Sequence, residues 1–200
     1  MKTAHALFSA TFLTLVSASS FAGSTIYTSS ADFLSHVAAG SYTENFDSLG
    51  LIPLGQLDFN SGAYSYSVSA PGSLYASGEF LGTNLPDEAL TINFNGANVT
   101  AVGSNFYAVN LSDAFHAVSL TLTLSYGTVT SFTPTSVTDS YRGFSSNIAI
   151  TSLVISGPGT SLYAGIDNLT VGVTAVPEPS SWALMGLGLA GLSLARRRLV

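Results

Sequence analysis

The sequence contains no cysteine, which excludes a disulfide framework and any cysteine-based metal site. Charged residues make up only 8% of the chain, too few for a coiled coil or an acid-rich disordered tail. Basic residues are scarcest: between Lys2 and the arginines that end the chain, Arg142 is the only lysine or arginine. The segment between Gly23 and Val176 contains ten aspartate and glutamate residues and only this one basic residue. This negative charge would repel a phosphate backbone, so we expect no nucleic-acid partner.

The first 22 residues have the three parts of a secretory signal peptide. Lys2 gives a positive start, residues 6–16 form an apolar run too short to span a membrane, and small residues stand at Ser20 and Ala22. We therefore expect cleavage after Ala22. A buried core helix is the alternative interpretation, but serine and threonine interrupt the run and turn-forming residues follow it.

The C-terminal region, residues 176–200, combines a proline–glutamate–proline motif, an apolar stretch and a basic cluster, in that order. The motif is Pro177, Glu178 and Pro179, the apolar stretch is 181–195, and the basic cluster is Arg196, Arg197 and Arg198. The prolines fix φ and keep the motif extended, which suits insertion into a protease cleft.

The apolar stretch predicts a C-terminal transmembrane helix. At ~1.5 Å per residue it is shorter than the ~30 Å hydrocarbon core. Trp182 at one interface and the arginines at the other can make up the difference, and the arginines should stay cytoplasmic. With a cleaved signal peptide in front, the region between the two ends is expected outside the cytoplasmic membrane.

This order of parts, VPEPSSWALMGLGLAGLSLARRR, resembles the PEP-CTERM protein-sorting signal. The resemblance implies a Gram-negative bacterium that makes exopolysaccharide, and processing by a membrane transpeptidase-like enzyme, exosortase. It implies that Pro177, Glu178 and Pro179 are the recognition motif and that the helix and the arginines hold the precursor in the inner membrane. A plain single-span anchor with an accidental Pro-Glu-Pro is the alternative.

Residues 23–175 are expected to form one all-β domain. Serine and threonine replace charge as the polar partners of alternating apolar residues, which is typical of strands. Many short strands separated by turn signals, with no alternation of strand and helix, predict an antiparallel β-sandwich, most simply a jelly roll. One short N-terminal helix is predicted over Ala31–Ala38, with Ser30 as N-cap and Gly40 as its stop.

The strands follow from individual patterns. The alternation at 118–126 and its return at 129–132 predict a hairpin, and a shift of face near Gly103 predicts a β-bulge there. The other expected strands are 64–68, 90–94, 99–101, 106–109, 148–155, which is apolar on both faces and so central, and 162–173.

The chain offers little for catalysis. It has no Gly-x-Ser-x-Gly nucleophile elbow, and His36 and His116 are the only histidines of the domain. Asp113 and His116 could form part of a metal or acid–base site, although a loop pair facing solvent explains them as well. A pair of carboxylates for glycoside hydrolysis stays open at this point, because only the fold brings such a pair together. We expect a protein that is not an enzyme.

Glu44 and Asp47 near the first strands, together with Asp167 on the last, form the best candidate metal site. Asp167 shares its phase with Leu169, which predicts a carboxylate directed toward the core and in need of a partner. The partner could be a structural calcium ion that Glu44 and Asp47 also bind, or it could be Arg142, whose guanidinium can form two parallel hydrogen bonds with a carboxylate. Alternatively, Asp167 accepts local backbone N–H groups.

Tyr141 and Arg142, followed by Gly143 and Phe144, form a second candidate site. These side chains could make a platform on which a sugar stacks, or they could be core and rim residues of the sandwich. Together with the tail, they suggest a non-enzymatic structural or adhesion module of an exopolysaccharide matrix, or biofilm, on the cell surface. A secreted polysaccharide hydrolase and a protein-binding surface module are the alternatives.

Overall fold

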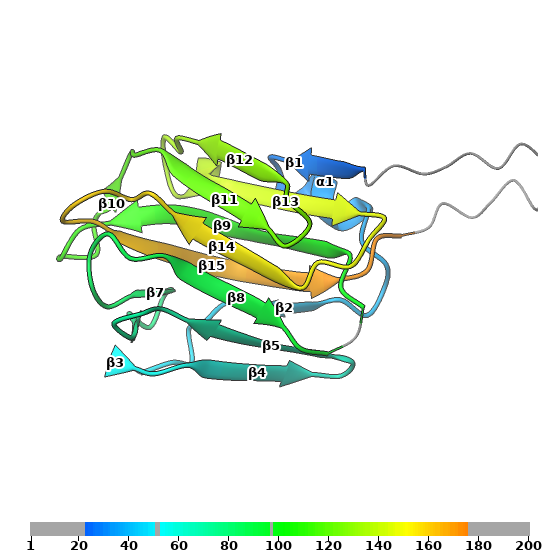
Figure 1. The fold of residues 1–200 in the computed structure, drawn as a ribbon, viewed down its shortest axis with the longest axis horizontal. Helices are drawn as coiled ribbons and strands as arrows, with labels where there is room; N and C mark the ends of the chain where they lie inside the picture. Colours follow the sequence, from blue (N-terminus) through cyan, green and yellow to red (C-terminus); the bar gives the residue numbers. More distant parts are fainter. Residues whose placement is uncertain (1–22, 51–52, 97, 176–200) are drawn as a thin grey trace, which may run out of the picture.

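The computed structural model describes residues 23–50, 53–96 and 98–175, which form two antiparallel sheets packed face to face (Figure 1). In the nine-stranded sheet the order is β1 (Ser24–Tyr27), β13 (Tyr141–Ser146), β9 (Ala101–Val109), β15 (Tyr163–Gly172), β7 (Leu81–Thr83), β6 (Leu74–Ala76) and β3 (Pro53–Leu54), with β10 (Phe115–His116) beside β9 and β2 (Tyr42–Glu44) beside β15. In the six-stranded sheet it is β12 (Val129–Phe132), β11 (Leu120–Leu124), β14 (Ser152–Ser156), β8 (Leu90–Phe94), β5 (Tyr64–Ser69) and β4 (Leu57–Ser61).

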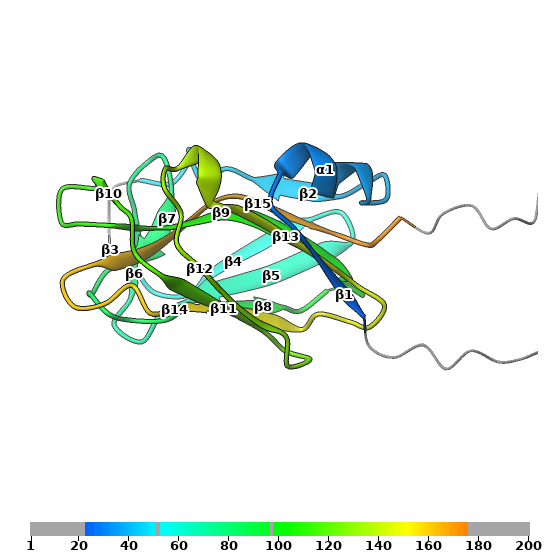
Figure 2. The ribbon, with the colours of Figure 1, turned by 90° about the horizontal axis from the view of Figure 1, so that it is seen from above.

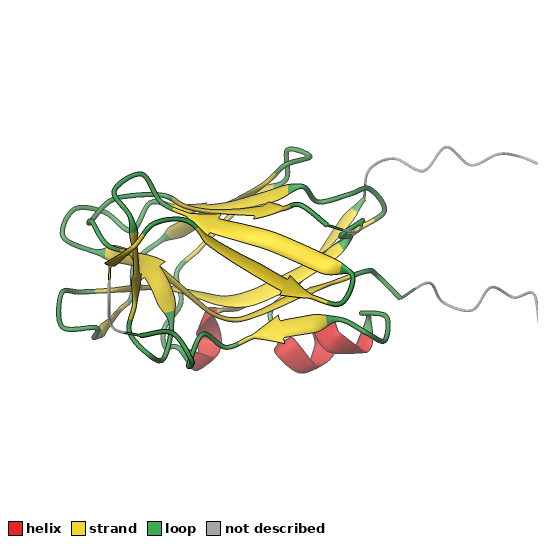
Figure 3. Cartoon of the chain, turned by 90° about the horizontal axis from the view of Figure 1, so that it is seen from below, coloured by secondary structure: helices red, strands yellow, loops and turns green. Residues whose placement is uncertain are grey.

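The core lies between the two sheets. Strand β8 shows why the sequence forms it: Leu90, Ile92 and Phe94 are buried, while the threonine and asparagine between them are partly exposed. Burying each such side chain contributes about 1.5–3 kcal/mol. Figure 3 shows the two layers from below, with both helical segments on the outer side of the nine-stranded sheet. They are α1 (Ser30–Ser35) and a 3₁₀ turn at Thr138–Ser140.

The predicted all-β, two-sheet antiparallel architecture is confirmed, and the jelly-roll connectivity stays a prediction. The predicted hairpin is β11 paired with β12, with Gly127 at φ 92° in its turn. The expected strand 148–155 forms only from Ser152 onward: Ile148 is exposed, whereas Ile150 is buried. As expected, β14 is central in its sheet, between β11 and β8.

The helix is shorter than predicted and begins one residue earlier. The N-cap is Ser29, whose Oγ accepts the N–H of Asp32, and the helix ends at Ser35 rather than Ala38. It ends there because Val37 pairs with Thr174 in a β-bridge and the Ala38 N–H donates to the Val173 carbonyl. Tertiary pairing with the end of the domain thus replaces the last helical turn.

The β-bulge lies on the strand opposite the predicted one. Strand β9 runs unbroken through Gly103, while in β15 the register shifts between Asp167, which pairs with Asn105, and Thr170, which pairs with Gly103. Asn168, at φ 52°, takes the irregular position. The Oγ of Ser104 donates to the Asp167 carbonyl at 2.7 Å, so the interrupted ladder keeps a partner there.

A cross-strand pair of glycines seats α1 on the nine-stranded sheet. Gly143 of β13 pairs with Gly103 of β9, and the fully buried ring of Phe33 lies over both. A Cβ at Gly143 would stand 2.5 Å from the Phe33 ring. The ring also packs edge-on against Tyr27 at 5.7 Å. The absence of two side chains therefore makes the space in which the helix docks.

Both ends of the described chain leave the sandwich at the same end (Figures 1 and 2). The C-terminal end is held firmly: Thr174 N–H donates to Thr100 Oγ1 at 2.8 Å, and Ala175 N–H donates to the His36 carbonyl at 2.8 Å. In the described ranges, no helix is long and apolar enough to cross a membrane. The predicted signal peptide with Ala22, and the predicted motif, helix and arginines of 176–200, lie outside these ranges.

Candidate ligand pocket

An aromatic cluster covers part of the outer face of the nine-stranded sheet. The ring of Phe80 lies over a second cross-strand glycine pair, Gly82 of β7 and Gly165 of β15, and a Cβ at either position would stand 3.3 Å from it. Tyr75 and Tyr107 meet Phe80 edge-to-face, with ring centroids 6.3 and 5.7 Å away. Phe80 and Tyr107 are buried although they lie on the outside of the sheet.

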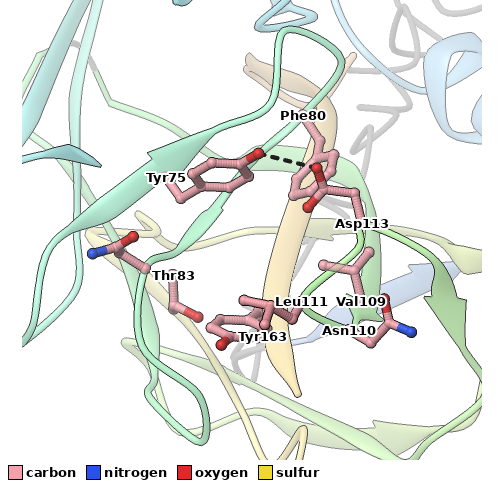
Figure 4. A pocket seen from close by; sticks show the side chains of 9 residues that line it. Tyr75, Phe80, Thr83, Val109, Asn110, Leu111, Asp113 and Tyr163 are labelled. Atoms are coloured by element: carbon pink, nitrogen blue, oxygen red, sulfur yellow. Dashed lines mark hydrogen bonds between the residues drawn. The ribbon is translucent and has the colours of Figure 1, made fainter. Parts of the chain in front are cut away.

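A cavity of about 140 Å³ opens beside this cluster (Figure 4). Its walls come from β6, β7, β9 and β15, from the segment between β6 and β7, and from the loops that follow β7 and β9. The residues that line it are Tyr75, Phe80, Thr83, Asn84, Val109, Asn110, Leu111, Asp113 and Tyr163. In Figure 1 these strand ends lie at the opposite end of the sandwich from the two chain termini.

The loop after β9 forms one wall of the pocket and is held in shape by its own side chains. Asn110 Oδ1 accepts the N–H groups of Ser112 and Ala114, and Asp113 adopts φ 59°. Asp113 Oδ2 accepts the Tyr75 hydroxyl at 3.0 Å, which ties the loop to β6. Leu111 is 85% exposed at the rim. The loop therefore presents an apolar side chain and a carboxylate side by side.

Thr83 contributes a polar group that the fold leaves unused. Its side chain is only 1% exposed, it lines the pocket, and its Oγ1 has no hydrogen-bond partner among the described residues. A buried hydroxyl without a partner costs about 1–3 kcal/mol. In Figure 4 this side chain lies beside the ring of Tyr163. A ligand that brings a hydroxyl to this point would satisfy it.

The electrostatic surroundings of the pocket are acidic. Burial raises the pKa of Tyr107, and the carboxylates of Asp167, Glu79 and Asp113 raise it further. No lysine or arginine lines the cavity. The guanidinium of Arg142 stacks on Phe132, 3.9 Å from the ring centroid, on strands that do not line it. A negatively charged ligand would be repelled here.

The side chain of Asp167 does not point into the core, so that prediction is wrong. The bulge places one extra residue between Asp167 and Thr170, so Asp167 faces the side of β15 opposite to the core residue Leu169. Asp167 accepts the N–H of Asn168 at 2.6 Å and its Nδ2 at 2.7 Å. The local-backbone alternative is thus what the structure shows, and the pairing with Arg142 is not formed.

The structure does not bring Glu44, Asp47 and Asp167 together as ligands. Glu44 accepts the Tyr42 hydroxyl and the N–H of Phe46, and Asp47 accepts Asn45 Nδ2 at 2.7 Å. Within the described part of the chain, no three histidine, aspartate or glutamate side chains gather closely enough to hold a metal ion. The arrangement gives the calcium prediction no support.

Asp167 nevertheless gives the domain a testable pH dependence. Burial raises the pKa of its carboxyl to about 6, the Asn168 N–H opposes this, and the charges of Asp47 and Glu79 add to it. The ionised form thus destabilises the fold above pH 6, and the penalty disappears as the pH falls toward the unfolded-state pKa of ~3.9.

Asp167→Asn is therefore expected to increase the stability of the domain more at pH 8 than at pH 4. The Asp167 side chain is partly exposed, so after solvent screening we expect about 1 kcal/mol, or 2–4 °C in Tm. The measurement is the change in Tm that the substitution causes at each of the two pH values. The control is Asp58→Asn, at a carboxylate that accepts a hydrogen bond from Gln56. An equal Tm change at both pH values would contradict the assignment.

Tyr141 and Arg142 do not form the predicted platform. Tyr141 is only 4% exposed and belongs to the buried cluster of Tyr27, Phe33 and Ala101. Arg142 Nη1 donates to the carbonyls of Asp139 and Tyr141, at 3.1 and 2.6 Å. Neighbouring strand residues point to opposite faces, so the two side chains cannot meet one ligand side by side. They are the core and rim residues of the alternative interpretation.

The histidines and Asp113 do not form an acid–base pair. His116 Nε2 faces Asn110 Nδ2 at 3.3 Å, while Asp113 accepts Tyr75. His36 Nδ1 lies 3.7 Å from Asp32 on α1.

The pocket residues Tyr75, Thr83 and Leu111 were not predicted. Only Leu111 could have been noticed in the sequence. It is a large apolar residue inside the polar turn Asn-Leu-Ser-Asp, and in the structure it is exposed.

The C-terminal region is the part of the chain that matches a known family. Neither a curated protein nor a solved structure matches the chain. Residues 175–198 match the model of the PEP-CTERM protein-sorting motif, so the resemblance drawn from VPEPSSWALMGLGLAGLSLARRR is confirmed. The motif implies export and processing by an exosortase. The chain therefore carries a PEP-CTERM protein-sorting motif, which implies exosortase-dependent sorting to the cell surface.

Proposed function

We propose that the β-sandwich is a non-enzymatic adhesion module that binds polysaccharide of the extracellular matrix through the pocket around Tyr75, Thr83 and Asp113. Export and exosortase sorting bring the domain to the surface. A Gram-negative host whose matrix contains exopolysaccharide is part of this proposal. The observation that carries it is the combination of aromatic walls with the buried, unpartnered hydroxyl of Thr83.

The chemistry of the pocket suits a sugar. Sugar rings have apolar C–H faces that pack on aromatic rings, and the walls offer Tyr75, Phe80 and Tyr163. Sugar hydroxyls both donate and accept hydrogen bonds, which matches the Thr83 hydroxyl, the Asn84 amide and the Asp113 carboxylate. A purely apolar ligand would leave the Thr83 hydroxyl without a partner.

The charge around the pocket narrows the class of polysaccharide. With Asp113 on the wall and Asp167 and Glu79 nearby, a uronate-rich polymer would be repelled. Neutral sugars escape this repulsion, and a free amino sugar would be attracted by Asp113. We therefore propose a neutral or amino-sugar polymer as the ligand.

A binding role is favoured over hydrolysis by the number of carboxylates. Glycosidases need two carboxyl groups about 5–9.5 Å apart across the scissile bond. Asp113 is the single carboxylate on the cavity wall, and it already accepts the Tyr75 hydroxyl. The pocket thus offers no second group for acid–base catalysis.

The test is a binding and hydrolysis assay with the domain 23–175 and the host's own polysaccharide. Tyr75→Ala is expected to weaken binding roughly tenfold, the equivalent of about 1.4 kcal/mol, because one wall of the pocket is lost. Leu111→Ala should weaken it less, and Leu34→Ala, at an exposed leucine on α1 away from the pocket, should not weaken it. Release of reducing ends would refute the non-enzymatic role, and full binding by Tyr75→Ala would refute the pocket.

A further inference from the structure

An aromatic ring bounds the pocket on the side that faces the middle of the nine-stranded sheet. On that side the strand pairing places Tyr75 of β6, Gly82 of β7, Gly165 of β15 and Tyr107 of β9 in one row across the sheet. The ring of Phe80 fills the space over the two glycines and packs against both tyrosines. A ligand in the pocket therefore meets this ring before it can extend along the sheet.

A hydrogen bond joins the two walls of the pocket at the same end. Strands β6 and β9 are separated by β7 and β15, which is about 14 Å at ~4.8 Å between neighbouring strands. The Tyr75 side chain and the loop after β9 bridge this distance, because the Tyr75 hydroxyl donates to Asp113 Oδ2 at 3.0 Å. Figure 4 shows this bridge at the end of the pocket where Phe80 lies. The pocket is thus closed at one end, and it opens at its rim, beside the exposed Leu111.

The volume of the pocket suits one sugar ring. The cavity measures about 140 Å³. A cavity of ~150 Å³ holds one benzene ring, whereas pockets for drug-sized ligands measure about 300–1,000 Å³. A second sugar ring therefore has to stay outside the pocket.

The closed end decides which residue of a polymer can enter. A residue inside a linear chain carries a glycosidic bond on each of two sides of its ring, so it needs a groove that is open at both ends. The last residue of a chain carries one such bond and needs one opening. The bridge between Tyr75 and Asp113 stands where the second bond of an internal residue would have to leave.

We propose that the pocket binds the last residue of a polysaccharide chain or side branch and does not bind residues inside the chain. This inference rests on the proposed function and narrows it from a class of polymer to a position on the polymer. The terminal ring stacks on the aromatic walls, and its glycosidic bond leaves past the rim. Each chain end then takes one domain, so the number of domains that a polymer binds follows its number of ends.

The experiment measures how many molecules of the domain 23–175, which contains both sheets, saturate a weighed amount of the host's polysaccharide. Partial hydrolysis to about a tenth of the chain length creates about ten times as many ends per gram, so the binding capacity is expected to rise about tenfold. An unchanged capacity would overturn the chain-end inference and leave the polysaccharide ligand in place. Absence of binding to both preparations would overturn the proposed function as well.

Borohydride reduction of the resulting oligosaccharides identifies the end that is bound. The reduction opens the ring of the reducing-end residue and leaves the other end of the chain intact. Loss of binding after reduction supports recognition of the reducing end, and retained binding supports recognition of the opposite end or of a side branch. If reduced oligosaccharides bind several domains per chain, in proportion to their length, chain-end recognition is wrong.

Two substitutions of Asp113 test the closed end itself. Asp113 adopts φ 59°, a conformation that glycine and asparagine tolerate well. Asp113→Gly removes the bridge, so a chain can leave the pocket over the ring of Phe80. At saturation, the intact polymer is expected to take up several-fold more of this variant. Asp113→Asn keeps an acceptor for the Tyr75 hydroxyl and should reach the unchanged capacity. Equal capacities of all three proteins would show that the bridge does not close the pocket, and would overturn the proposal.

Discussion

Replacement of Pro177, Glu178 and Pro179 by alanine is expected to leave the full-length precursor uncleaved in the membrane. The segment 175–198 matches the sorting motif, and the two prolines fix φ at alternate positions of its recognition sequence. Alanine keeps the length of the tail but allows it to turn helical and removes the glutamate. The loss of processing should be close to complete, because no second Pro-Glu-Pro occurs in the chain.

The readout is the mass and cellular fraction of the protein after a pulse of synthesis. Ser180→Ala with Ser181→Ala is the matched control, since it alters the same tail beside the motif. This control should be cleaved and leave the membrane fraction at the normal rate. Normal cleavage of the triple-alanine chain would contradict the role of the motif, whereas poor cleavage of both would point to a general defect of the tail.

Gly143→Ala is expected to cost about 3 kcal/mol of folding free energy, the upper part of the range for overpacked cores. The new Cβ would stand 2.5 Å from Cδ2 and 2.7 Å from Cγ of Phe33. Phe33 cannot swing away, because it is fully buried between Tyr27, Tyr141 and the sheet. For a domain of this size the loss corresponds to a Tm lower by about 6–12 °C.

A double-mutant cycle separates this clash from a general cost of alanine in a strand. Phe33→Ala alone should cost about 3–5 kcal/mol, because it leaves a cavity under α1. Gly143→Ala added to Phe33→Ala should cost little, so the two changes couple by about 2 kcal/mol or more. Gly55→Ala, where a Cβ meets nothing within 4 Å, is the control. Additive losses would show that the helix does not depend on the glycine pair.

Local patterns in the sequence predicted much of the fold. Strands such as Leu90–Phe94 and Leu120–Leu124 alternate with a period of two, and turn residues mark where they end. The errors arose where a distant part of the chain decides. The helix stops early because Val37 pairs with Thr174, and Asp167 faces outward because the bulge lies on β15. Neither pairing leaves a local trace in the sequence.

The sorting signal could be predicted and the pocket could not, for a physical reason. The sorting signal is continuous, so its parts stand in order in the sequence. The pocket depends on Gly82 lying opposite Gly165, two residues far apart in the chain that meet only once β7 pairs with β15. That pairing lets the ring of Phe80 lie over the two glycines, beside Tyr75 and Tyr107. A glycine and a phenylalanine near it in sequence are too common to indicate this.

We propose that the domain binds a neutral or amino-sugar polymer in the pocket distant from the sorting signal. The most direct test is an NMR titration of the labelled domain 23–175 with oligosaccharides cut from the host's matrix polymer. We expect chemical-shift changes at Tyr75, Thr83, Leu111 and Asp113, saturating together, and no change at Thr100 or Thr174. Binding that leaves the pocket signals unmoved, or no binding of any matrix oligosaccharide, would contradict the account.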